Sequence, residues 1–245
     1  MKILALYDVH GNIDALDAVL ADPRAQGHDA VVVGGDVIPG PWAADVLRRL
    51  DGLAAPAHWL RGNGEREVAA IPWDTPRPQD PQDDIVLATG ILSAQQLSPT
   101  RVHALGELPL TVTLDGVLFC HATPRSDEEI LTRLSPPDRY ADALAGVGQH
   151  LVVGGHTHQQ HDVQVGATRF VNAGSVGLPY EGDGAARWVL VDDGEPRLMS
   201  TTYDHASAGQ RILEAGWPDR DSVGAAMTDL VPALEVTQLF ESQAT

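Results

Sequence analysis

Residues 2–12, KILALYDVHGN, contain the stretch of sequence that decides the fold. The apolar run from Ile3 to Tyr7 has the length of a buried strand, and it stops abruptly at Asp8, where polar and glycine residues take over. Asn12 suits a helix N-cap, and apolar residues return after it at helical spacing. The stretch therefore predicts a buried strand, a polar loop and a helix.

The same strand-loop-helix unit recurs further along the chain. Ala30–Val33 is a second buried strand that ends at Gly35-Asp36, and a helix opened by Pro41 follows it. Ala57–Leu60 is a third strand, which ends at Gly62-Asn63. Such alternation predicts parallel strand pairs with right-handed crossovers, and it gathers the polar loops at the carboxyl ends of the strands.

The second half of the chain is rich in predicted strands. Asp115-Gly116 separates two apolar runs and is a strong hairpin signal. Leu151–Val153 again ends in glycine and polar residues, and further strands with antiparallel pairing follow to about residue 193. Two mixed sheets packed face to face, with helices outside, would bury all of these strands. The expected fold is therefore an α/β (α+β) four-layer αββα sandwich.

We expect residues 1–245 to form a single domain. Residues 72–92 are expected to be a surface excursion, because they begin with a Pro-, Asp- and Gln-rich segment, and residues 203–245 a C-terminal helical extension. The first apolar run is too short for a signal peptide, and no run approaches the ~20 apolar residues of a membrane span. The sequence thus predicts a cytoplasmic protein without a membrane partner.

The formal net charge of −18 at pH 7 constrains the partners of the chain. Nucleic-acid binding needs a clustered basic face, so stable nucleic-acid binding is not expected. Cys120 is the only cysteine, which excludes a disulfide or a thiolate zinc site within one chain. A metal site would have to use His, Asp and Asn, and bound cations would offset part of the negative charge.

Potential metal ligands stand at five predicted strand ends. One Asp-x-His or His-x-His pair alone more often caps a loop, but open sheets bring all of these ends to one crevice. Mixed carboxylate, imidazole and amide ligands suit Mn, Fe, Zn, Co or Ni better than Ca or Cu(I). The candidate ligands, in chain order, are Asp8, His10, Asp36, Asn63, His121, His156 and His158.

In their order and spacing, these motifs resemble those of the calcineurin-like metallophosphoesterases, and within them the small bacterial and archaeal predicted phosphodiesterases. The blocks D-x-H, GD, GN, H and GHTH stand here at residues 8–10, 35–36, 62–63, 121 and 155–158. Residues 121–125 (HATPR) and 172–179 (NAGSVGLP) add to the likeness. The resemblance covers residues 2 to about 193 and implies the metallophosphoesterase fold.

The resemblance also implies two divalent metal ions and a role for each ligand. One ion would be held by Asp8, His10, Asp36 and His158, and the other by Asp36, Asn63, His121 and His156. Asp36 would then bridge the ions, and a metal-bridging hydroxide would attack a phosphodiester or phosphomonoester of a small soluble substrate, such as a nucleotide. The expected catalytic residues are Asp36, His10 and Asn63, and the candidate substrate contacts are Asn12, Glu65 and Arg125.

Gly64 departs from the best-studied phosphatases of that family, in which a histidine follows the GN pair and stabilises the transition state or protonates the leaving alcohol. Loss of such a group typically removes a factor of ~10²–10⁴ in rate for poor leaving groups. We therefore expect diesters with good leaving groups to be preferred over monoesters. A histidine introduced at position 64 is expected to raise monoester activity.

Two other functions stay open from the sequence. A phosphoprotein phosphatase would need a groove that accepts a peptide. Gly64 weakens this alternative, because alkyl phosphomonoesters have poor leaving groups. A catalytically weak metal-binding scaffold is the second alternative, although the intact ligand set speaks against it. The remaining histidines are expected in packed or solvated settings, except His161, which is expected behind the ligands or on the surface, with a substrate contact left open. Ser175 lacks the strand-turn-helix elbow of a serine nucleophile. The sequence leaves a homo-oligomer open.

Overall fold

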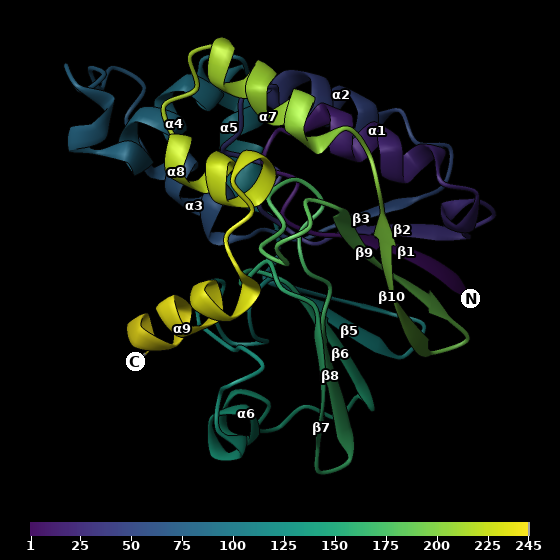
Figure 1. Cartoon of the computed structure of the whole chain (residues 1–245). Coiled ribbons are helices and arrows are strands. Elements are labelled where there is room, and N and C mark those ends of the chain that lie inside the picture. The colour runs from purple at the N-terminus through teal and green to yellow at the C-terminus, as the bar shows by residue number, and fades with distance from the viewer. Residues whose placement is uncertain (245) are drawn as a thin grey trace.

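The computed structural model describes residues 1–244. Two mixed five-stranded sheets lie face to face, and helices cover their outer sides (Figure 1). Parallel and antiparallel strand pairs occur in both sheets. The predicted α/β sandwich of two mixed sheets flanked by helices is therefore confirmed.

The first sheet joins the three N-terminal parallel strands to a later antiparallel hairpin. Its strands, in spatial order, are β10 (Glu195–Thr201), β9 (Ala186–Asp192), β1 (Lys2–Leu6), β2 (Ala30–Val33) and β3 (Ala57–Trp59). The sequence analysis missed β10, because Pro196 weakens the strand pattern. An edge strand tolerates this proline, and Asp193-Gly194 supplies the hairpin turn.

The second sheet contains the predicted hairpin at Asp115-Gly116, where both residues have positive φ. Its strands, in spatial order, are β4 (Thr111–Leu114), β5 (Val117–Cys120), β6 (Leu151–Gly154), β8 (Thr168–Asn172) and β7 (His161–Val165). The three strands β5, β6 and β8 are parallel. Their carboxyl ends therefore meet at one edge of this sheet.

Both faces of β1 are buried. Ile3 and Ala5 belong to the apolar core between the two sheets, whereas Leu4 and Leu6 face the helices, because successive side chains of a strand alternate. Full burial of a leucine or isoleucine side chain contributes about 1.5–3 kcal/mol. Packing on both sides therefore anchors the loop that begins at Asp8.

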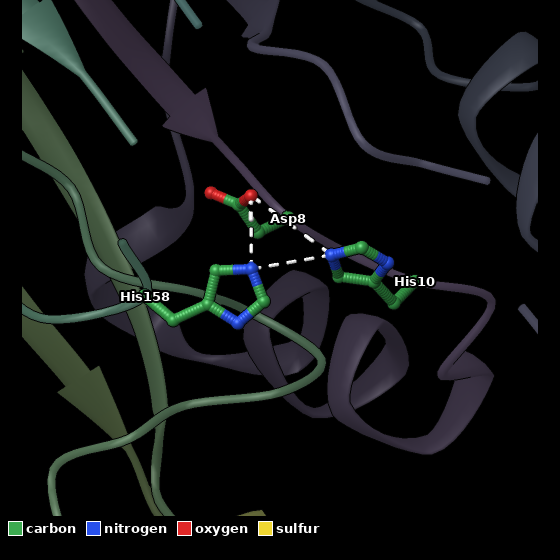
Figure 2. Close-up of side chains that lie close together, drawn as sticks. All are labelled: Asp8, His10 and His158. Atoms are coloured by element: carbon green, nitrogen blue, oxygen red, sulfur yellow. Dashed lines mark hydrogen bonds and ion pairs between the residues drawn. The ribbon is translucent and has the colours of Figure 1, made fainter. Parts of the chain in front are cut away.

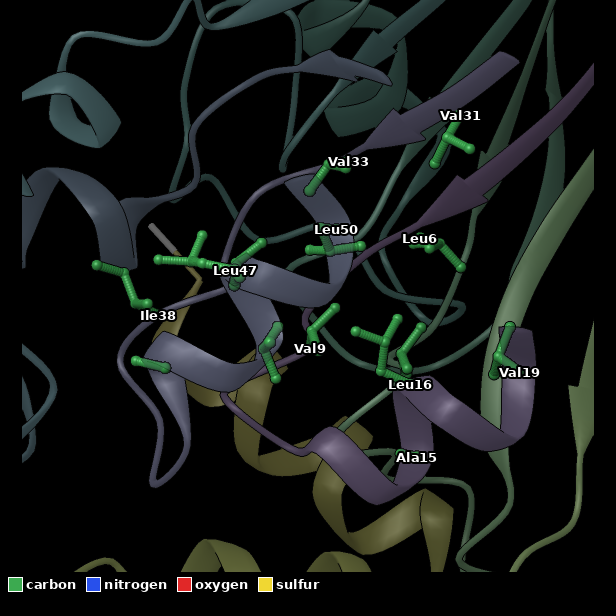
Figure 3. Packing of buried hydrophobic residues seen from close by; sticks show 14 of the residues in the cluster. Leu6, Val9, Ala15, Leu16, Val19, Val31, Val33, Ile38, Leu47 and Leu50 are labelled. Atoms are coloured by element: carbon green, nitrogen blue, oxygen red, sulfur yellow. The ribbon is translucent and has the colours of Figure 1, made fainter. Parts of the chain in front are cut away.

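Helices cover the outer face of the first sheet, and Figure 3 shows how their apolar sides pack. Leu16 and Val19 come from α1 (Ile13–Ala21), and Leu47 and Leu50 from α2 (Ala43–Asp51). The other helices of this part are α3 (Asn63–Ala70), α5 (Pro99–Gly106) and the short η1 (Pro23–Ala25). The N-cap predicted at Asn12 is confirmed for α1, and Ser98 caps α5.

The surface excursion predicted at residues 72–92 is shorter than expected. Residues 72–84 contain the short 3₁₀ helix η2 (Pro81–Asp83), but α4 (Ile85–Ala94) begins directly after its N-cap, Asp84. Helix α4 buries Ala88, Ile91 and Ala94 against the rest of the domain. Asp84 followed by an apolar run was a usable signal for the start of α4. The proline-rich segment before it obscured this signal.

The remaining helices lie around the second sheet and in the C-terminal extension. Helix α6 (Pro137–Ala143) covers the second sheet, where Tyr140 packs against Phe170. The extension contains α7 (His205–Glu214), α8 (Arg220–Val223), the π-helical turn η3 (Gly224–Thr228) and α9 (Ala233–Gln243). Figure 1 shows α9 apart from α7, on the side of the second sheet. Within residues 1–244, every helix is too short or too polar to cross a membrane.

Candidate metal centre

The predicted ligands meet at the carboxyl ends of the strands. Their ligand atoms form two groups, and within each group all of them lie within 4.8 Å of one another. The first group, shown in Figure 2, is Asp8, His10 and His158, and the second is Asp36, His121 and His156. Asn63, the seventh predicted ligand, lines the same cavity as members of both groups. The structure therefore brings all seven predicted residues together.

Asp36 connects the two groups. Its Oδ2 lies 3.7 Å from His10 Nε2 and 3.4 Å from His121 Nε2, so it reaches one imidazole of each group. The backbone N–H of Gly64 donates to its other oxygen, Oδ1, at 2.8 Å. Asp8 Oδ1 also lies 3.8 Å from His121 Nε2. The two groups are therefore parts of one continuous site.

Backbone carbonyls fix the tautomer of three imidazoles. In each, Nδ1 lies 2.7–3.2 Å from a carbonyl oxygen, and the pairs are His10 with Pro39, His121 with Gly34, and His158 with Leu178. A carbonyl oxygen only accepts, so Nδ1 carries the proton and the lone pair of the neutral ring lies on Nε2. All three Nε2 atoms face the carboxylates of Asp8 or Asp36. This is how metal-binding histidines are usually oriented.

Several polar atoms of the site have no hydrogen-bond partner among the described residues, and a bound cation would satisfy them. Of the five buried side-chain atoms without a hydrogen-bond partner among residues 1–244, three belong to the site, namely Asp8 Oδ1, Asn63 Oδ1 and His121 Nε2. Each such atom costs about 1–3 kcal/mol when unsatisfied. In addition, His10 Nε2 and His158 Nε2 lie 3.2 Å apart with their lone pairs toward one another. The donor set therefore fits divalent metal ions.

The electrostatics of the site also fit a bound cation. Burial opposes a charge on His121, but the carboxylates of Asp36 and Asp8 prevail and raise its pKa to about 10. Burial and the neighbouring imidazole of His121 lower the pKa of His156 to about 4. Burial likewise lowers the pKa of His10. The carboxylates of Asp8 and Asp36 thus favour positive charge beside His121, which bound cations would supply.

The backbone of five ligand residues lies in the left-handed region. Their φ values are +52° at Asp8, +45° at His10, +49° at Asp36, +70° at His156 and +57° at His158. Among the described residues, only three other non-glycine positions have positive φ. Such conformations cost about 1–3 kcal/mol each and concentrate at functional sites. The strain therefore coincides with the ligands rather than with ordinary turns.

Glu65 holds the loops that carry the ligands. Its buried carboxylate accepts hydrogen bonds from the backbone N–H groups of Asp36, Val37 and Gly62 at 2.8 Å and of Ile38 at 3.2 Å. These bonds join the loop after β2 to the start of α3. The carboxylate does not line the cavity beside the ligands. The position of Glu65 is thus that of a support for Asp36, not of the substrate contact expected from the sequence.

The structure places Asn12 and Arg125 outside that cavity as well. Asn12 is fully buried, where it caps α1 and donates to the carbonyl of Gly177. Arg125 lies on the surface and forms ion pairs with Glu129 and Asp142. Their environments account for both side chains without a substrate.

His161 lies in β7, away from the ligands. Its ring packs between Tyr140 and Phe170, and Nδ1 donates to the carbonyl of Gln159. Burial lowers its pKa to about 4. His161 is therefore a buried residue of the second sheet, whereas the sequence analysis expected it near the ligands or on the surface.

Two residues of the site were missed by the sequence analysis. Glu67 accepts a hydrogen bond from Asn63 Nδ2 at 3.3 Å, which leaves the amide oxygen of Asn63 free to face the ligands. The ring of Tyr180 stacks on His158 with centroids 4.9 Å apart and 12° between the planes. The i,i+4 spacing of Asn63 and Glu67 on one helix was a usable signal. No sequence pattern indicated Tyr180.

Gly64 has no room for a side chain. A Cβ atom there would lie 2.2 Å from the carbonyl oxygen of Ile38 and 2.9 Å from Asp36 Oδ1. Contacts this short require the backbone to move. The crowding at position 64 therefore argues against the gain in activity that the sequence analysis expected from a histidine there.

The chain belongs to the calcineurin-like phosphoesterase superfamily, because the family model for that domain matches residues 1–193. Membership identifies it as a metallophosphoesterase, a hydrolase of phosphate esters. The metal-ligand candidates all fall within the matched residues. A search of curated proteins found no match.

Several solved structures share the fold of this chain. A hypothetical protein from Pyrococcus horikoshii OT3 is 20% identical, with 92% of this chain and 97% of that chain covered and a TM-score of 0.78. A metallophosphoesterase from Sphaerobacter thermophilus is 22% identical, with 93% and 100% covered and a TM-score of 0.72. A cold-active protein-tyrosine phosphatase of a psychrophilic Shewanella species is 16% identical, with 80% of each chain covered and a TM-score of 0.53. These likenesses concern the fold alone.

Proposed function

We propose that the protein is a dinuclear metal-dependent phosphodiesterase that acts on a small soluble phosphate ester. The observation that carries this proposal is the position of Asp36 Oδ2, within 3.7 Å of an imidazole nitrogen from each ligand group. Asp36 would be shared by two divalent ions. One would be held in addition by Asp8, His10 and His158, and the other by Asn63, His121 and His156.

Two divalent ions, when bound, would supply Lewis-acid activation of a water molecule and of the phosphoryl group. The protein positions the groups around the reacting ester. His10 and Asn63 line the cavity, so they lie beside the place where the phosphoryl group would bind. Glu67 orients the amide of Asn63, and the Gly64 N–H fixes the Asp36 carboxylate. These contacts preorganise the site, which lowers the reorganisation needed for reaction.

Two features favour diesters over monoesters. Position 64 supplies no imidazole beside Asn63, so a poor leaving group would not be protonated from there. The cavity beside the ligands, with a volume of about 250 Å³, offers space for an additional ester group.

Hydrolysis assays with added Mn²⁺ test this proposal. We expect bis(p-nitrophenyl) phosphate to be hydrolysed faster than p-nitrophenyl phosphate, and Asp36→Ala to abolish both the activity and the bound metal. Elemental analysis of the purified protein would identify the ion among Mn, Fe, Zn, Co and Ni. No hydrolysis above the metal blank would favour the scaffold alternative, and a preference for phosphopeptides would favour a phosphoprotein phosphatase.

A further inference from the structure

The cavity beside the candidate metal centre has apolar side walls from two separate parts of the chain. Ile85 and Val86 of α4 form one wall. Further lining residues come from the C-terminal extension, namely Ile212, Trp217, Val223 and Met227. All four lie beyond residue 193, where the match to the family model ends. A hydrogen bond from Gln82 Nε2 to the carbonyl of Pro218, 2.9 Å long, joins the two parts.

The charge on the cavity walls is negative. Glu67 and Asp219 line it, and no lysine or arginine of residues 1–244 does. Proteins that bind phosphate or carboxylate groups without a metal usually supply arginine or lysine side chains. An anionic group outside the metal centre would therefore meet carboxylates and apolar surface instead of a cationic partner.

Aromatic surfaces define the shape of the cavity. Trp217 is only 8% exposed, and Tyr180 is held against His158 by stacking. Rigid aromatic side chains provide a large apolar contact area for a ring. A volume of about 250 Å³ lies below the roughly 300–1,000 Å³ typical of sites for drug-sized ligands, so the occupant is a small group.

We propose that this cavity is a subsite for one uncharged, apolar or aromatic ester group of the substrate, and that it disfavours substrates with a second anionic group, such as polyphosphates. The inference rests on the proposed function, because the phosphate must lie on the metal centre, whose ligands line the same cavity. The C-terminal extension would then determine which ester is accepted, while the family-matched residues carry the reaction.

Ligand binding tests the subsite without turnover. Isothermal titration of the Mn²⁺-loaded protein should show diphenyl phosphate binding at least about tenfold more tightly than dimethyl phosphate, because the ring is buried. Trp217→Ala should remove most of this preference. The matched control Trp73→Ala truncates a tryptophan that is 56% exposed and outside the cavity, so it should keep the preference. Equal affinities in the wild type, or a preference untouched by Trp217→Ala, would overturn the proposal.

A variant at Val86 tests the charge preference without disturbing the core, because this side chain is 58% exposed. Phenyl p-nitrophenyl phosphate and 4-carboxyphenyl p-nitrophenyl phosphate release the same leaving group and differ by one carboxylate. We expect the wild type to favour the phenyl ester by about tenfold in kcat/KM, as like charges repel. Val86→Lys should bring the two kcat/KM values closer together, because the added ammonium group attracts the carboxylate. The uncharged control Val86→Gln should leave their ratio unchanged.

The outcomes separate the two proposals. A wild-type ratio near one, or a ratio unchanged by Val86→Lys, would contradict the subsite while leaving the phosphodiesterase intact. If neither ester were hydrolysed but diphenyl phosphate kept its tighter binding, the proposed function would fail and the subsite would stand.

Discussion

His10 Nε2 and His158 Nε2 lie 3.2 Å apart, although 148 positions separate the two residues in the chain. Both rings donate Nδ1 to a backbone carbonyl, so the two lone pairs point toward one another (Figure 2). Burial and the proximity of His158 lower the pKa of His10, which keeps this ring neutral. Both rings would be ligands of a bound cation, which would replace this repulsion by coordination, so we expect the stability of the site to depend on metal.

Metal binding is predicted to stabilise the fold. Mn²⁺ at 100 times its Kd should add about 2.7 kcal/mol to the free energy of unfolding, and EDTA should reverse the gain. Asp36→Asn should lose most of this gain, because it removes charge from the shared ligand. Asp45→Asn, a change at an exposed carboxylate of α2, is the control and should keep it. Thermal unfolding with and without Mn²⁺ measures the effect, and equal shifts in both variants would exclude Asp36 as a ligand.

Glu65→Gln is predicted to weaken both the fold and metal binding. The substitution replaces one acceptor oxygen by an NH₂ group, which would face backbone N–H donors instead of accepting from them. We expect the free energy of unfolding to fall by about 2–4 kcal/mol. Glu67→Gln is the control, because a glutamine can still accept the single bond from Asn63. Urea unfolding and Mn²⁺ titration report the two effects. A fully stable Glu65→Gln protein would show that the four bonds are dispensable.

Gly64→Ala is predicted to destabilise the protein by about 1–3 kcal/mol, since its Cβ would clash with the carbonyl of Ile38. Gly64→His should accordingly show no gain in p-nitrophenyl phosphate hydrolysis. Gly148→Ala is the control, because nothing lies within 4 Å of a Cβ at that position. Urea unfolding compares the variants, and a stable, monoester-active Gly64→His protein would contradict the prediction.

Asp127 is predicted to make stability depend on pH in the acid range. Burial opposes its charge, but Arg66 and Arg61 prevail and hold its pKa below the usual range. A depressed pKa stabilises the fold above the ordinary value near 4, and the contribution is lost as pH falls through the folded-state pKa. Asp127→Asn should thus be less stable than the wild type at pH 7, and the difference should shrink toward pH 3. Glu128→Gln, at a more exposed partner of Arg66, should change stability less.

Local patterns in the sequence predicted where the metal-ligand candidates lie. The buried strands β1 and β2 are short apolar runs that end in glycine or a carboxylate, and parallel strands bring such ends to one edge. The positions of Asp8 and Asp36 follow from these two facts alone. The contributions of Glu65 and Glu67 required the hydrogen-bond partners to be known, since a glutamate near a ligand can face solvent as readily as the backbone.

The cavity walls could not be predicted in this way. Ile212 and Trp217 are ordinary apolar residues of an amphipathic segment, and their sequence does not indicate which surface they cover. Likewise, the clash at Gly64 comes from the Ile38 carbonyl, whose position depends on the loop after β2. These features depend on contacts between segments that lie far apart in the chain.

Anomalous scattering from Mn²⁺-soaked crystals would test the central claim most directly. We predict two peaks about 3.5–4 Å apart with Asp36 between them. One peak should lie beside Asp8, His10 and His158, and the other beside Asn63, His121 and His156. A single peak, or a pair of peaks that Asp36 does not contact, would contradict the dinuclear centre.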